Sequence, residues 1–161
     1  PFWILIFANS IVFYFKKQVY YDKIVENYEI IDGIVVIPHG VTMIREKAFY
    51  GCKNLKRIVL PENLSYLGSS AFCGCENLKT ATVKGKLDDY RADCVFPFQN
   101  CSSLETLTFL DCVRYIKEES CNGCKSLKNI FVPAKKGDYY KKRFVEELHP
   151  LIVELEAKKK K

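Results

Sequence analysis

A unit of 23 residues recurs along this chain and constrains its fold more than any other feature of the sequence. The stretch AFYGCKNLKRIVLP at 48–61 returns as AFCGCENLKTATVK at 71–84. Units of this kind cover 38–60, 61–83, 84–109 and 110–132, and Pro133 opens a fifth. Self-similarity at such a period is typical of repeat architectures, in which no single unit can bury its own apolar face. The repeats are therefore predicted to stack into one continuous core.

Each repeat contains a segment of the form L-x-x-I-x-L whose later apolar positions alternate as in a strand. The segments begin at Leu55, Leu78, Leu104 and Leu127. They predict short parallel strands near 34–37, 57–60, 80–83, 106–109 and 129–132. Two further apolar columns, which start at Val41 and Ile44, match the return side of each repeat.

The AFxGC piece of each repeat predicts a short helical turn that ends at a left-handed residue. The end position is held by Gly51, Gly74, Asn100 and Gly123. Glycine, and less often asparagine, adopts this conformation at low cost. The phenylalanines of this piece, Phe49 and Phe72, are predicted to be buried.

This pattern resembles the BspA-like (treponemal-type) leucine-rich repeats, whose unit reads roughly I-P-x-x-V-x-x-I-x-x-x-A-F-x-G-C-x-x-L-x-x-I-x-L. IPHGVTMIREKAFYGC and LPENLSYLGSSAFCGC match it closely, whereas 84–132 depart from it: Pro97 replaces the alanine and Cys121 the phenylalanine. The tail IFVPAKKGDYYKKRF at 130–144 looks like the closing segment of the family, with a helix near 138–147 and a last strand around Leu151 to Leu155. The resemblance covers about 33–155.

The resemblance implies an α/β repeat fold. We expect a leucine-rich-repeat solenoid with a short parallel sheet on one side, short helical turns on the other, and a C-terminal helix and strand cap. The expected division is an apolar N-terminal segment and cap at 1–32, the repeats at 33–132, the C-terminal cap at 133–157 and a basic tail at 158–161.

The segment 2–15, FWILIFANSIVFYF, is apolar except for Asn9 and Ser10. A membrane span needs about 20 apolar residues, so this stretch fits a truncated signal or membrane anchor. The lysines that follow it, where a signal peptide would carry its charges before the apolar run, argue against a complete signal peptide. The alternative is that these aromatic side chains pack over the open end of the core.

Cysteine is abundant, with eight residues. Four share one column of the repeat, Cys52, Cys75, Cys101 and Cys124, which predicts small buried apolar side chains. CGC at 73–75 and CNGC at 121–124 are spaced like metal or redox pairs, but the second cysteine of each belongs to the repeat column. We expect no metal and no cofactor. Cys94 and Cys112 lie outside the column and are the best candidates for reactive thiols.

Neither catalysis nor nucleic-acid binding is indicated. The two histidines, His39 and His149, are tied to no nucleophile by a motif, and the chain carries no phosphate-binding loop or nucleophile elbow. The net charge is +6, but the last four residues are a lysine run of the kind usually found as a solvated tail. Basic residues are not interleaved with aromatics on one face. A non-enzymatic protein is therefore predicted.

The outward positions of the predicted strands form the candidate binding surface. Apolar columns face inward, so the intervening residues face out. The candidate residues are Arg57, Val59, Thr80, Thr82, Thr106, Thr108, Asn129 and Phe131. Lys56, Lys79, Glu105 and Lys128 flank them, and Ile34 and Val36 extend the two columns. Repeat proteins commonly bind through such a face, although stacked threonines are also ordinary exposed strand residues.

The family is mostly found on bacterial cell surfaces, where several members are described as adhesins. The resemblance thus implies a surface-displayed or secreted module that binds a protein of a host or neighbouring cell, such as an extracellular-matrix protein. Two alternatives stay open. The chain could be the C-terminal capping fragment of a longer repeat protein, or a cytoplasmic scaffold for protein interaction.

Overall fold

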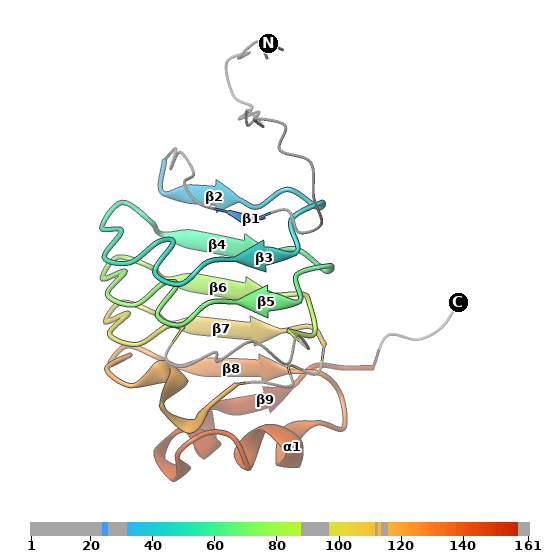
Figure 1. Cartoon of the computed structure of the whole chain (residues 1–161). Coiled ribbons are helices and arrows are strands. Elements are labelled where there is room, and N and C mark those ends of the chain that lie inside the picture. Colours follow the sequence, from blue (N-terminus) through green and yellow to red (C-terminus); the bar gives the residue numbers. More distant parts are fainter. Residues whose placement is uncertain (1–23, 26–31, 88–96, 112, 114–115, 158–161) are drawn as a thin grey trace, which may run out of the picture.

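The computed structural model describes residues 24–25, 32–87, 97–111, 113 and 116–157 (Figure 1). Its main element is a parallel sheet with the strand order β2-β4-β6-β7-β8-β9. The strands are β2 (Ile34–Val36), β4 (Arg57–Leu60), β6 (Thr80–Val83), β7 (Thr106–Phe109), β8 (Asn129–Val132) and β9 (Ile152–Glu154). The five strands predicted from the repeats are confirmed to within one residue, and all are parallel.

A second, narrower parallel sheet lies on the return side of the repeats. It consists of β1 (Ile24–Val25), β3 (Met43–Ile44) and β5 (Tyr66–Leu67), in the order β1-β3-β5. The sequence predicts apolar columns here but no strands, because a two-residue strand is too short to show alternation. β1 pairs with β3 although it precedes the first complete repeat, so the stacking begins upstream of residue 33.

The predicted left-handed column is confirmed. The φ angles of Gly51, Gly74, Asn100 and Gly123 are 65°, 73°, 59° and 80°. The predicted helical turn is shorter than a helix in the first three repeats, and among the described residues of the repeats only the fourth contains a 3-10 helix, η1 (Glu118–Cys121). The reason is that turn amides pair with the next repeat: Phe49 N–H donates to the carbonyl of Ala71, and Phe72 N–H to that of Pro97.

The core lies between the two sheets and the turns. Phe49 and Phe72 are buried, as predicted, with 2% and 0% of their surface exposed. Their rings stack with centroids 5.0 Å apart, and Phe98 continues the stack 5.5 Å beyond Phe72. Cys121, in the phenylalanine position of the fourth repeat, is also buried. Three members of one sequence column thus form a continuous ring stack, and a buried cysteine takes the place of the ring in the fourth repeat.

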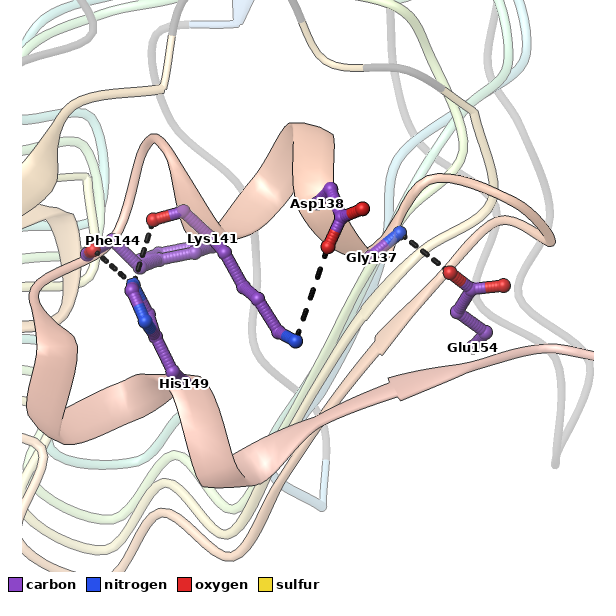
Figure 2. A network of polar contacts seen from close by, with 6 residues as sticks. All are labelled: Gly137, Asp138, Lys141, Phe144, His149 and Glu154. Atoms are coloured by element: carbon purple, nitrogen blue, oxygen red, sulfur yellow. Dashed lines mark hydrogen bonds and ion pairs between the residues drawn. The ribbon is translucent and has the colours of Figure 1, made fainter.

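The C-terminal segment folds differently from the predicted helix near 138–147. The helix α1 (Gly137–Lys141) ends early, and a 3-10 helix, η2 (Glu146–Leu151), leads into β9. Phe144 is buried, with its ring 6.3 Å from that of Phe109, so the chain must turn inward after α1. His149 stabilises this turn, because its Nε2 lies 2.7 Å from the carbonyl oxygen of Lys141 and 3.0 Å from that of Phe144 (Figure 2).

Candidate protein-binding surface

The outward side chains of the six-stranded sheet form two columns that cross the strands in register. Pairing places Ile34, Arg57, Thr80, Thr106 and Asn129 side by side in the first column. The second column runs through Val36, Val59, Thr82, Thr108, Phe131 and Val153. The strands β6, β7 and β8 alternate between half-buried outward and buried inward side chains, because the inward ones fill the core.

The structure brings the eight candidate residues onto this one face. Arg57 is exposed, and the other seven are half-buried; the side chain of Val36 lies outside the described residues. Val153 was missed by the sequence reasoning, although it is 41% exposed and pairs with Phe131. The alternation in LIVEL at 151–155 is the signal that could have found it. Ile34 is 42% exposed, so the face carries an exposed aliphatic side chain near each end.

A row of charged residues precedes the strands at the amino-terminal edge of this face. It consists of Lys56, Lys79, Glu105 and Lys128, called the basic row below. Backbone bonds align it: the amides of Lys79, Glu105 and Lys128 each donate to the carbonyl of the preceding row member, at 2.8 to 2.9 Å. Lys128 Nζ lies 2.8 Å from Glu105 Oε2. This hydrogen bond and the positive charge lower the pKa of the Glu105 carboxyl.

In the part of the chain that is described, the cysteines of the repeat column pack in the core or against it. Cys75, Cys101 and Cys124 are buried, as predicted, whereas Cys52 is half-buried. Contacts with Cys124 and Cys75, together with burial, raise the pKa of the Cys101 thiol, and contact with Cys124 and burial raise that of Cys121. No group of three potential ligands that could hold a metal ion occurs among the described residues. Cys94 and Cys112 lie outside them.

Both histidines take part in hydrogen bonds within the protein. Nδ1 of His39 lies 3.1 Å from Oδ1 of Asn63, whose amide nitrogen donates to the carbonyl of Val41.

A groove of about 420 Å³, which Asn63 also lines, lies at the carboxyl-terminal ends of the strands. It is lined by Glu62, Asn63, Leu64, Ser65, Lys84, Lys86, Leu110 and Asp111. Its charged side chains are of both signs, so it offers no single ligand chemistry.

The described ranges contain no helix that is both long and apolar enough to cross a membrane. The apolar segment 2–15, predicted to be a truncated anchor or a packed cap, lies outside these ranges, and so does the tail 158–161.

Comparison with known proteins agrees with the repeat geometry. The family model for the BspA-type leucine-rich repeat region matches residues 20–147 with six copies. The match begins upstream of residue 33, at which the sequence resemblance starts, in agreement with the pairing of β1 and β3. Neither a curated protein nor a solved structure gives a significant match. On the strength of the family match and of its stacked parallel repeats, the chain belongs to the BspA-type leucine-rich repeat family.

Proposed function

We propose that this chain is a non-enzymatic adhesion module, displayed on a cell surface or secreted, which binds a protein of a host or neighbouring cell. The stacked repeats would form an open solenoid whose outward sheet face is the contact surface. Membership of a leucine-rich repeat family supports a role in protein–protein interaction. The adhesive role and the extracellular location go beyond family membership and are part of the proposal.

The observation that carries the proposal is the composition of the outward sheet face. Six strands in register give an extended, rigid surface, of the kind that repeat proteins use for binding. Exposed Arg57 lies beside half-buried Val59 on β4, and Phe131 pairs with exposed Val153 at the other end. Arginine and aromatic side chains are enriched among residues that dominate binding energy. Threonines between them leave room for a partner to approach.

The test is adhesion of the variant Arg57→Ser, Val59→Ser and Phe131→Ser to immobilised extracellular-matrix proteins. We expect binding to fall by at least about tenfold, because the change removes the cationic and two apolar anchors. A matched control replaces Lys53, Leu110 and Tyr50 by serine, since these are also one cation, one aliphatic and one aromatic side chain, all exposed and none of them within a strand of the sheet. Full binding by the first variant, with its fold intact by circular dichroism, would contradict the proposal.

A further inference from the structure

The amino-terminal edge of the sheet carries positive charge that the described part of the chain does not pair. In the described ranges, no carboxylate forms an ion pair with Lys56, Arg57 or Lys79. All three side chains are exposed, and they lie at the start of adjacent strands: Lys56 and Lys79 directly precede β4 and β6, in which Arg57 pairs with Thr80. Neighbouring strands are about 4.8 Å apart, so these charges form one compact cationic site.

The same row contains an example of the interaction that such a site would make. Glu105 follows Lys79 and precedes Lys128 in the basic row, and Lys128 Nζ lies 2.8 Å from its carboxylate. The charge of Lys79 also lowers the pKa of Glu105. A carboxylate therefore fits between lysines at this spacing. Among the described residues no carboxylate forms an ion pair with Lys56 or Lys79, which leaves both for the carboxylate of another molecule.

Lys56 is positioned by the backbone beneath it. Its amide and that of Arg57 both donate to the carbonyl of Gly33, at 2.6 and 3.0 Å. The aliphatic part of the Lys56 side chain packs over Gly33, because a Cβ at position 33 would lie only 2.6 Å from its Cγ and Cδ. Gly33 has a φ of 82°, which favours glycine. This packing restricts the lysine stem and lowers the entropy that binding would cost.

We propose that Lys56, Arg57 and Lys79 recognise carboxylates of an acidic protein segment that lies along this edge of the sheet. The inference rests on the proposed function and names the chemistry of its partner. A protein fits better than a nucleic acid or a sulfated glycan, because polyanions bind long continuous cationic tracks and Glu105 interrupts this one. The exposed aliphatic side chain of Ile34, which pairs with Arg57, also suits a protein partner.

The experiment measures binding of a fluorescent peptide of alternating glutamate and serine by anisotropy. A peptide with glutamine in place of glutamate is the uncharged comparison. We expect Lys56→Glu with Lys79→Glu to weaken binding of the acidic peptide by at least about fivefold, since two attractive contacts become repulsive. The matched control is Lys84→Glu with Lys86→Glu, which makes the same change of charge at the opposite edge of the sheet. It should alter binding by less than about twofold at physiological salt.

Glu105→Gln gives a change in the opposite direction. Removal of this carboxylate frees Lys128 and extends the cationic site, so the peptide should bind about two- to fivefold more tightly. If both lysine-pair variants weakened peptide binding equally, the effect would come from the net charge of the protein and not from this edge of the sheet. That result would overturn the inference. Binding of a short heparin oligosaccharide through Lys56 and Lys79, with none of the peptide, would also overturn it.

The two proposals fail separately. If the triple serine variant loses adhesion while Lys56→Glu with Lys79→Glu keeps both adhesion and peptide binding, the sheet face binds a protein but the acidic partner is wrong. If the lysine pair variant loses peptide binding while the triple variant adheres fully, the cationic site is real and the proposed adhesion surface is wrong.

Discussion

The thiol of Cys101 donates a hydrogen bond of 3.1 Å to the backbone carbonyl of Phe72 in the preceding repeat. The column repeats this bond twice more: Cys75 donates to Phe49 at 3.0 Å, and Cys124 to Phe98 at 3.1 Å. A cysteine here fills the core and also joins successive turns. This explains why the column keeps a thiol where alanine would be the simpler small residue.

Replacement of Cys101 by alanine should destabilise the protein by about 1–3 kcal/mol, because it leaves a small cavity and removes the bond to Phe72. Urea unfolding followed by circular dichroism measures this change. Cys52→Ala is the control, since Cys52 is half-buried and begins the column; its effect should be clearly smaller. Equal effects of the two substitutions would contradict a linking role for the column.

The six described cysteines are free thiols, and we expect them to react slowly while the protein is folded. Five of the six are buried, which keeps a reagent from reaching them. Contacts with neighbouring thiols and burial raise the pKa of Cys101 and Cys121, which disfavours their thiolates. Hydrogen bonds from neighbouring thiols lower the pKa of Cys75 and Cys124, so at these two positions burial alone slows the reaction. A thiol reagent should modify them quickly only in denaturant, and elemental analysis should find no stoichiometric zinc. Fewer than about half of the cysteines titrating as thiols in denaturant would contradict the prediction that they are reduced.

Phe72 lies in the middle of the ring stack, with Phe49 5.0 Å on one side and Phe98 5.5 Å on the other. Phe72→Ala should therefore cost about 3–5 kcal/mol of unfolding free energy, and Phe49→Ala should fall in the same range. Tyr50→Ala, next to the stack but 59% exposed, is the control and should change the urea midpoint little. Unchanged urea midpoints in both phenylalanine variants would contradict the claim that this column of the repeat stabilises the core.

Tyr140 joins the C-terminal segment to the fourth repeat. Its hydroxyl donates to the carbonyl of Asp111 at 2.8 Å and accepts from the amide of Val113 at 3.1 Å. Tyr140 is fully buried, so Tyr140→Phe leaves two polar groups without this partner and should cost about 1–3 kcal/mol. Tyr139→Phe loses one bond, to the carbonyl of Val113, from a half-buried site that water can reach, and should cost less. Amide exchange at Val113 should quicken in the Tyr140 variant, and unchanged exchange there would argue against this link.

The strands and the left-handed column of Gly51, Gly74, Asn100 and Gly123 could be predicted because each is a column seen several times in the sequence. Asn100 was informative for that reason: its φ of 59° puts it with the three glycines. Features that occur once, or only over two residues, gave no such signal. β3 and β5 are too short to alternate, and α1 ends at Lys141 because Phe144 turns into the core, which is a tertiary effect.

The candidate face was predicted for the same reason, since inward columns imply outward ones. Val153 was missed because β9 belongs to the C-terminal segment and not to a repeat. The charge pattern of the basic row could be read from the sequence, but its pairing could not. Only the structure shows that Glu105 neutralises Lys128, while Lys56 is held over Gly33 without a carboxylate partner in the described chain.

Glu154 makes stability depend on pH. Its carboxylate accepts a bond from the amide of Gly137, at 2.8 Å and at the start of α1 (Figure 2). It accepts a second bond from the amide of Lys135, at 2.7 Å. The bond from Gly137, and then that from Lys135, lower the pKa of Glu154 in the folded state. The folded protein therefore binds this proton less readily than the unfolded chain does. The resulting stabilisation is complete above the unfolded pKa and is lost as the pH falls through the folded one.

Glu154→Gln should remove this contribution. The variant should therefore have a smaller unfolding free energy than the wild type. This difference should be largest near neutral pH and should shrink as the pH falls below the ordinary glutamate pKa of about 4.3. Urea unfolding at a series of pH values measures the difference, with Glu156→Gln as the control for loss of one exposed carboxylate. Gly137→Ala is a second probe, because its Cβ would lie 2.7 Å from Oε1 of Glu154 and displace the carboxylate. A difference that stays constant from neutral to acid pH would show that this carboxylate does not stabilise the start of α1.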